Sequence, residues 1–159
     1  MTKNRYSKIR RKRGPVTAKK VVHDGVTFAS GLEKYMYIAL KKAKIKFEYE
    51  GENFELVKPF EFDSEAHERQ NNGKGEYIDR GNKRILGIKY TPDFVGVDFI
   101  IETKGRANES FPMRWKLFKR HLIEIGDNRL IYKPQTNKEC DRTVELILKK
   151  QTWDYLNKE

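Results

Sequence analysis

The stretch from Tyr90 to Gly105 constrains the fold most, and it reads Y-T-P-D-F-V-G-V-D-F-I-I-E-T-K-G. Pro92 disfavours a helix in the residue before it, and the apolar residues on both sides of Gly96 are typical of two short strands. The stretch therefore predicts a β-hairpin that turns near Gly96. If the hairpin closes there, Asp93 at the start of the first strand lies beside Glu102 at the end of the second.

Charged side chains end the second strand of this hairpin. Because side chains alternate across a strand, Glu102 and Lys104 point to the same face as Ile100. Magnesium prefers oxygen ligands and often takes one or two carboxylates together with water and phosphate, so Asp93 and Glu102 are candidate ligands. Lys104 is a candidate for orienting an attacking water and for stabilising the negative charge that develops on a phosphate.

An isolated Glu-x-Lys also has a simpler interpretation, because it is common at the solvated end of a surface strand. The complete pattern is more specific, since Pro92-Asp93 is separated by eight residues from Glu102-Thr103-Lys104. This pattern resembles that of the PD-(D/E)xK nuclease superfamily. Its presence favours a catalytic interpretation of the three charged residues.

Four further motifs are similar to those of phage endonuclease I, of the Holliday-junction resolvase type. They are F-A-S-G-L-E at 28–33, F-E-Y-E at 47–50, T-P-D-F at 91–94 and E-T-K-G at 102–105. The segment 23–33 also resembles the D-G-x-x-F-x-S-x-x-E opening of small uncharacterised phage nucleases. The likeness spans roughly residues 20–133.

The resemblance implies a single α/β domain at 21–159, of the restriction-endonuclease-like kind with an αβββαβ core. It implies a Mg²⁺-dependent DNA endonuclease, with Mn²⁺ as a substitute ion. Asp93, Glu102 and Glu33 would serve the metal, and Lys104 would complete the catalytic set. One alternative is a resolvase that cuts Holliday junctions or other branched DNA; another is a catalytically silent nucleic-acid-binding or virion-associated protein on the same fold. Symmetric cutting of two strands needs two sites, so a homodimer is expected.

Glu33 has two interpretations. Ser30-Gly31-Leu32-Glu33 is a capping box, in which the glutamate would reach back to the start of the helix that follows. The resemblance instead implies that Glu33 binds the metal or positions its water. The residues alone favour the cap, and the resemblance shifts the prediction to a catalytic role.

Apolar periodicity predicts the other elements. Helices are expected at 30–43, from Pro112 to about Ile125, and at 141–156, the second with a buried stripe of Trp115, Phe118, Leu122 and Ile125. Strands are expected at 47–62 in pieces, at 85–90 and at 129–133, with a small hairpin at 21–28. Residues 63–83 are polar and rich in Asn and Gly, which predicts a mobile loop or a poorly paired insertion.

The net charge of +11 is concentrated at the start of the chain, where residues 1–20 hold nine basic residues and no acid. Such a run predicts a flexible, disordered arm that binds DNA through its phosphates, or else a solubilising tail. A cationic face on the second helix is a further DNA contact, unless it is simply solvated. The DNA-binding candidates are Lys8, Arg10, Arg11, Lys12, Arg13, Lys19, Lys20, Arg114, Lys119 and Arg120.

Several function classes are disfavoured. No apolar run approaches the ~20 residues of a membrane span, and no signal-peptide core follows the basic start, so we expect a soluble cytoplasmic protein, located in the host cytoplasm if it is phage-encoded. A single cysteine, Cys140, excludes an intramolecular disulfide and a cysteine zinc cluster. We expect DNA as a partner, and neither a membrane nor an organic cofactor.

Overall fold

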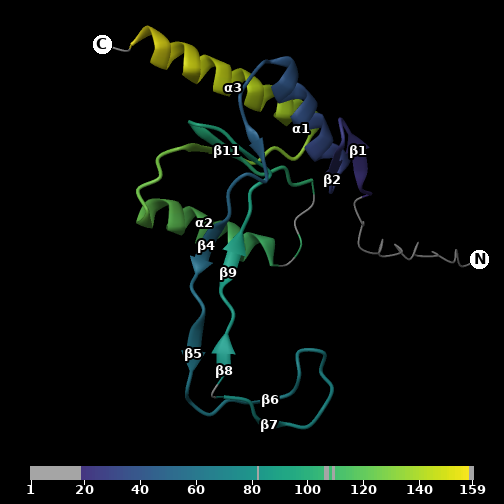
Figure 1. Ribbon diagram of the computed structural model, residues 1–159, viewed down its shortest axis with the longest axis vertical. Coiled ribbons are helices and arrows are strands. Elements are labelled where there is room, and N and C mark those ends of the chain that lie inside the picture. The colour runs from purple at the N-terminus through teal and green to yellow at the C-terminus, as the bar shows by residue number, and fades with distance from the viewer. Residues whose placement is uncertain (1–18, 82, 106–107, 109, 158–159) are drawn as a thin grey trace, which may run out of the picture.

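The computed structural model describes residues 19–81, 83–105, 108 and 110–157, and these mix helices and strands in an α/β arrangement (Figure 1). The helices are α1 (Gly31–Lys42), α2 (Phe111–Glu124) and α3 (Asn137–Leu156). The strands are β1 (Val21–His23), β2 (Val26–Phe28), β3 (Glu48–Tyr49), β4 (Phe54–Val57), β5 (Phe60–Phe62), β6 (His67–Glu68), β7 (Ile78–Asp79), β8 (Lys83–Ile85), β9 (Ile88–Tyr90), β10 (Phe94–Val95), β11 (Phe99–Ile101) and β12 (Leu130–Tyr132). Among these residues, no helix combines the length and apolar character needed to cross a membrane.

The central sheet has four strands in the order β12-β11-β10-β3. Strand β10 pairs antiparallel with both β3 and β11, whereas β11 and β12 run parallel. The predicted hairpin is thus β10 and β11, with Phe94 opposite Ile101 and Val95 opposite Ile100. Its turn is closed by a hydrogen bond from the Gly96 amide to the Phe99 carbonyl (2.9 Å).

Helices cover both faces of this sheet, with α1 and α3 on one side and α2 on the other (Figure 1). Alternation along the strands divides the core accordingly, because neighbouring residues point to opposite faces. The cluster on the α1 and α3 side comprises Met36, Leu40, Ile45, Phe94, Phe99, Ile101, Cys140 and Ile147. The cluster on the α2 side comprises Phe54, Tyr90, Val95, Ile100, Phe111, Phe118 and Leu122.

The start of α1 follows the predicted hairpin and capping box. Strands β1 and β2 are joined by Asp24 and Gly25, both at positive φ (50° and 76°), as a tight two-residue turn requires. Ser30 is the N-cap of α1, and its hydroxyl group accepts a hydrogen bond from the Glu33 amide (3.2 Å). The Glu33 carboxylate accepts the Ala29 amide (2.9 Å) rather than that of the N-cap residue itself. Glu33 therefore caps the start of α1 as the capping box predicts, but it does so through the amide of Ala29, the residue before the N-cap.

Residues 54–90 form a two-stranded ribbon that leaves the body of the protein (Figure 1). Its base, β4 with β9, packs on α2, where the rings of Phe54 and Tyr90 lie 5.0 and 4.5 Å from that of Phe118. Further out β5 pairs with β8, and then β6 with β7. The segment 63–83 thus contains one short ladder, β6 with β7, which agrees with the expectation of a poorly paired insertion.

Two predicted helices differ from the structure in their details. Helix α3 begins at Asn137, four residues earlier than expected, because Thr136 caps it by accepting the Glu139 amide (3.2 Å). Ile125 was expected in the buried stripe of α2, but it follows the helix as its C-cap and is exposed. Trp153 is also exposed near the end of α3.

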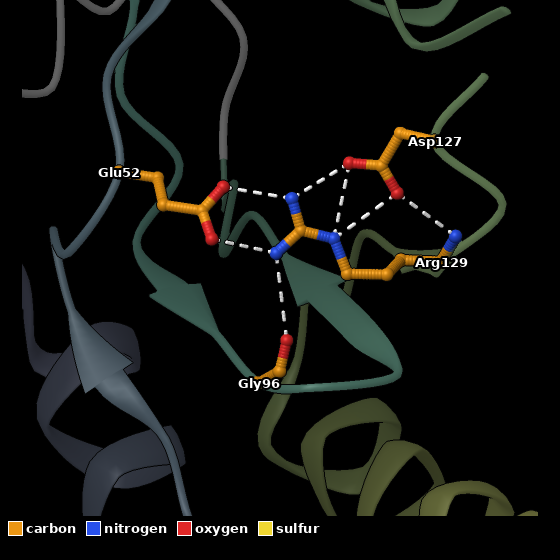
Figure 2. Close-up of polar contacts among 4 residues, drawn as sticks. All are labelled: Glu52, Gly96, Asp127 and Arg129. Carbon is orange, nitrogen blue, oxygen red and sulfur yellow. Dashed lines mark hydrogen bonds and ion pairs between the residues drawn. The ribbon is translucent and has the colours of Figure 1, made fainter. Parts of the chain in front are cut away.

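Arg129 ties together three loops at the turn end of the β10–β11 hairpin (Figure 2). Its guanidinium group donates to both carboxylate oxygens of Glu52 (2.7 Å each), to Asp127 (as short as 2.6 Å) and to the Gly96 carbonyl (3.5 Å). The hydrogen bonds that Arg129 donates to Asp127 lower the pKa of Asp127, which keeps this carboxylate charged. The clamp holds the turn, and with it the register of the hairpin.

We predict that Arg129→Ala lowers the free energy of unfolding by about 1–3 kcal/mol, because it leaves two carboxylates without their shared cation. Urea denaturation followed by circular dichroism measures the loss. Arg142→Ala is the control, because Arg142 forms an exposed pair within one helix with Glu145 (2.7 Å). An equal effect of the two changes would contradict the role of the clamp.

Candidate active site

Asp93 and Glu102 lie at the open end of the hairpin, opposite the Arg129 clamp. Phe94 pairs with Ile101, so Asp93 and Glu102 occupy the next facing positions beyond the ends of β10 and β11. The amide and the hydroxyl group of Thr103 both donate to Oδ2 of Asp93, each at 2.6 Å. The Asp93 carboxylate is therefore held in place, while no hydrogen bond from a described residue engages its Oδ1.

Burial makes the two carboxylates electrostatically unfavourable neighbours. Glu102 is only 5% exposed, whereas Asp93 stays partly accessible. Burial, and then the charge of Glu102, raises the pKa of Asp93 to about 8. Burial likewise raises the pKa of Glu102. A site that holds two close carboxylates in this way gains from any cation that binds between them.

Lys104 is the cation that the structure itself provides. Its Nζ lies 3.6 Å from Oε1 of Glu102 and 4.7 Å from the centre of the Phe111 ring, at the start of α2. The charge of Lys104 lowers the pKa of Glu102, but it does not offset the effect of burial. Asp93, Glu102 and Lys104 are thus brought together, as the sequence predicted.

Glu33 approaches this group from the N-terminus of α1, and its charge helps to raise the pKa of both Asp93 and Glu102. Its carboxylate is already well occupied. In addition to the Ala29 amide, it accepts hydrogen bonds from the hydroxyl groups of Ser30 and Tyr49, both at 3.0 Å. The structure therefore places Glu33 beside the pair as a fixed neighbouring charge.

The fit to a metal ion is partial. Within the described ranges, no three His, Cys, Asp or Glu side chains surround a common point suited to a metal ion. Asp93 and Glu102 remain as a pair of oxygen donors, of which Glu102 is buried and Asp93 is partly accessible with its Oδ1 available. A pair is enough for Mg²⁺, which commonly completes its shell with water and substrate phosphate.

Tyr90 belongs to the site, although the sequence analysis did not identify it. Its hydroxyl group is buried and, among the described residues, has no hydrogen-bond partner, yet it lies near enough to Glu102 to lower the pKa of that carboxyl group. An unpaired buried hydroxyl is costly unless water or a ligand satisfies it. In the sequence, the one signal for a role of Tyr90 is its position two residues before Pro92.

Lys133 is the second residue that sequence reasoning missed. It follows β12, which lies beside β11, and the Glu102 amide donates to the Tyr132 carbonyl (3.0 Å). The Lys133 ammonium group lies 5.8 Å from the centre of the Phe111 ring, the same ring that Lys104 approaches. Two lysines thus flank one ring beside the carboxylate pair.

The predicted DNA-binding residues have different outcomes. Lys8, Arg10, Arg11, Lys12 and Arg13 lie outside the described residues, and Lys19 and Lys20 are exposed ahead of β1. On α2, Arg114 donates to the Lys89 carbonyl, which brings it close to Tyr90. Arg120 pairs with Glu124 (2.6 Å), and Lys119 lies 5.6 Å from the centre of the Trp115 ring. Of the three helix residues, these contacts link only Arg114 to the site.

A protein family described as "Protein of unknown function (DUF1064)" matches residues 13–138, which include all the residues of the site. The chain belongs to this family. Comparisons with curated proteins and with solved structures gave no match. The description of the DUF1064 family names no activity, so the geometry of the site has to carry the functional argument.

The raised pKa of Asp93 predicts how stability depends on pH. Between its ordinary value of 3.8 and about 8, the folded protein holds a proton that the unfolded chain releases, so the free energy of unfolding falls as pH rises through this window. Asp93→Asn should remove part of this fall and make the protein more stable than wild type at pH 8, by at least about 1 kcal/mol.

Urea unfolding in EDTA at pH 5 and pH 8 tests this expectation. Glu145→Gln, at an exposed position on α3, is the matched control and should follow the wild type at both pH values. If Asp93→Asn were less stable than wild type at pH 8, the electrostatic cost of the pair would be disproved.

Proposed function

We propose that the protein is a Mg²⁺-dependent DNA endonuclease. The observation that carries the proposal is the pair of Asp93, which is partly accessible, and Glu102, which is buried; the pKa values of both are raised, and Lys104 lies beside Glu102. Two such carboxylates are difficult to explain as structural groups, because Lys104 alone does not offset the effect of burial on Glu102. They are what a divalent ion with oxygen ligands requires.

The order of elements around the sheet supports membership of the PD-(D/E)xK superfamily. Along the chain come α1, β3, β10, β11, α2 and β12, with the ribbon inserted between β3 and β10. This is the αβββαβ order that the motif resemblance implies, followed here by α3. The resemblance implies that the four motif residues come from the first helix and from the second and third strands; Glu33 lies on α1, Asp93 directly before β10, and Glu102 and Lys104 after β11, which supports the proposal.

Asp93 and Glu102 would hold the ion, which supplies charge stabilisation at the phosphate and lowers the pKa of a bound water. Thr103 fixes Asp93 through its two hydrogen bonds, so that Oδ1 stays available. Lys104 orients the attacking water and stabilises the charge that develops on the phosphate. Hydrolysis would then proceed by in-line attack of water on the phosphorus: a bond from phosphorus to the water oxygen forms as the opposite bond to a sugar oxygen breaks, the water loses a proton to solvent, the sugar oxygen gains one, and no covalent intermediate forms on the protein.

Glu33 acts in this scheme as a positioning residue. Its carboxylate is held by three donors, so it affects the site through its charge and through Tyr49, whose ring packs 5.4 Å from that of Phe94. Lys133 is suited to a phosphate next to the reacting one, because it lies on the same side of the sheet as Lys104. DNA as the substrate is supported by the net charge of +11.

Cleavage assays on four DNA substrates test the proposal. Linear duplex, single-stranded, nicked and four-way-junction DNA are each incubated with Mg²⁺ or with EDTA. We expect the protein to cut DNA in the presence of Mg²⁺ and not in the presence of EDTA. Selective cutting of the junction would identify a branched-DNA resolvase, whereas cutting of none of the four would favour a DNA-binding protein without activity.

We predict that Asp93→Asn and Glu102→Gln each lower the single-turnover cleavage rate by at least about 100-fold. Each change removes one charge from the ion's site and nearly keeps its shape, so DNA binding should persist. Glu145→Gln is the control for loss of an exposed carboxylate. Wild-type cleavage by either variant at saturating Mg²⁺ would show that the pair does not hold the ion.

Glu33→Gln separates the two roles of Glu33. An amide oxygen can still accept from Ala29 and Tyr49, and the Ser30 hydroxyl can turn to accept from the amide nitrogen, so the loss of stability should stay below about 1 kcal/mol. Cleavage should nevertheless fall steeply, while the melting temperature falls by no more than about 4 °C. A variant that melts earlier but cuts normally would restrict Glu33 to capping.

A further inference from the structure

The hydroxyl group of Tyr90 is the only buried polar group of a side chain that has no hydrogen-bond partner among the described residues. Tyr90 is 5% exposed and ends β9, three residues before Asp93. Buried hydroxyl groups nearly always have a partner, because burial removes the hydrogen bonds that water would make with them. An unpaired donor beside two candidate metal ligands therefore indicates a role that involves the site.

Packing of the Tyr90 ring fixes the position of this hydroxyl group. The ring stacks on that of Phe118 in α2, with the ring centres 4.5 Å apart and the planes inclined by 29°. The Trp115 ring lies 6.2 Å away, and Tyr90 pairs with Phe54 at the base of the ribbon. The ring thus belongs to the core cluster on the α2 side, which needs no hydroxyl group.

Glu102 is the carboxylate that the hydroxyl group can reach. Tyr90 and Ile100 belong to the same core cluster, and Glu102 follows Ile100 by two residues, so its side chain points to the same face of the sheet. Burial raises the pKa of Glu102, and among the groups that lower this pKa Tyr90 has the largest effect. Burial and the charge of Glu102 raise the pKa of Tyr90, so the hydroxyl group keeps its proton and can donate it in a hydrogen bond.

The two carboxylates of the site differ in how they are held. Asp93 accepts two hydrogen bonds from Thr103, each at 2.6 Å. The Glu102 carboxylate accepts no hydrogen bond from the described residues, and the Lys104 ammonium group lies 3.6 Å from its Oε1. Carboxylates that bind metal ions are usually oriented by a hydrogen bond from a neighbouring group. Tyr90 has an unused donor where Glu102 needs one.

We propose that Tyr90 is a positioning residue, whose hydroxyl group donates a hydrogen bond to the Glu102 carboxylate when Asp93 and Glu102 hold a divalent cation. The inference rests on the proposed function in one respect, namely that this pair is a metal site. Tyr90 then orients Glu102 as Thr103 orients Asp93. The cost of burying the hydroxyl group without a partner is relieved on binding, which strengthens the binding of the ion.

Tyr90→Phe tests this role, because it removes the hydroxyl group and keeps the packed ring. Mn²⁺ is the probe, since it suits oxygen ligands and its free form is measured directly by electron paramagnetic resonance. We expect the Kd of the full chain for Mn²⁺ to rise by about tenfold. Urea unfolding in EDTA should show no loss of stability, because the described residues offer the hydroxyl group no hydrogen bond to lose. A residue that only supports the fold would give the opposite pair of results.

Tyr35→Phe is the matched control for loss of a tyrosine hydroxyl group. The Tyr35 hydroxyl group is exposed and donates to Asp141 (3.0 Å), between α1 and α3. This change should leave the affinity for Mn²⁺ as it is in the wild type. Asp93→Asn is the reference for the pair itself and should weaken Mn²⁺ binding more than Tyr90→Phe, because it removes a charge that contacts the ion.

Two results would overturn the inference and leave the proposed metal site in place. In the first, Tyr90→Phe binds Mn²⁺ as tightly as wild type while Asp93→Asn does not. In the second, Tyr90→Phe is less stable than wild type in EDTA, which would show that the hydroxyl group already has a partner without the ion.

The remaining outcomes separate the inference from the nuclease function. A wild-type chain that binds no Mn²⁺, or an Asp93→Asn variant that binds it normally, would disprove both the role of Tyr90 and the metal site. Weaker Mn²⁺ binding by Tyr90→Phe, in a protein that cuts none of the four DNA substrates, would support the role of Tyr90 and disprove the nuclease function.

Discussion

The antiparallel register of β10 and β11 is the constraint on which the rest of the structure depends. With Phe94 opposite Ile101, alternate residues of the hairpin supply the two core clusters, and the next facing positions hold Asp93 and Glu102. A slip of one residue would exchange the two faces, putting core residues toward the wrong helices and separating the carboxylates. One register therefore serves both packing and chemistry.

The two ends of this hairpin have opposite electrostatics. At the turn, Arg129 satisfies Glu52 and Asp127, and the pKa of Asp127 is lowered. At the open end, Asp93 and Glu102 face each other with raised pKa values, and the Lys104 ammonium group lies 3.6 Å from Glu102. Stability is thus gained at the end where no chemistry is expected. At the open end, the two neighbouring carboxylates lower stability, and the polar groups there are suited to binding an ion and a phosphate.

Local signals in the sequence were sufficient for much of the fold and for most of the site. The hairpin, the turn at Asp24 and Gly25, and the cap at Ser30 each follow from residues close together in the chain, so short-range rules predict them. The start of α3 had an equally local signal, Thr136 followed by Glu139, which the apolar periodicity of the helix obscured.

Contacts between distant segments could not be predicted in this way. Tyr90 and Lys133 join the site because β9 enters it from the ribbon and β12 aligns with β11, and neither arrangement has a local signature. For the same reason the sequence could not decide between a mobile loop and a poorly paired insertion at 63–83. Its strands are too short and too polar to show alternation, and β5 with β8 brings them together.

The ribbon leaves the sheet after β3 and returns immediately before β10, and these two strands are neighbours. Its two ends are held together at the neck, where the Glu50 amide donates to the Asp93 carbonyl (2.9 Å). The entropy lost on closing a loop grows only slowly with its length, so this long excursion adds little to the cost of pairing β3 with β10. The neck separates the folding of the central sheet from the length of the ribbon, which leaves the ribbon free to be lengthened, shortened or reshaped while the sheet and the candidate site at its end stay the same.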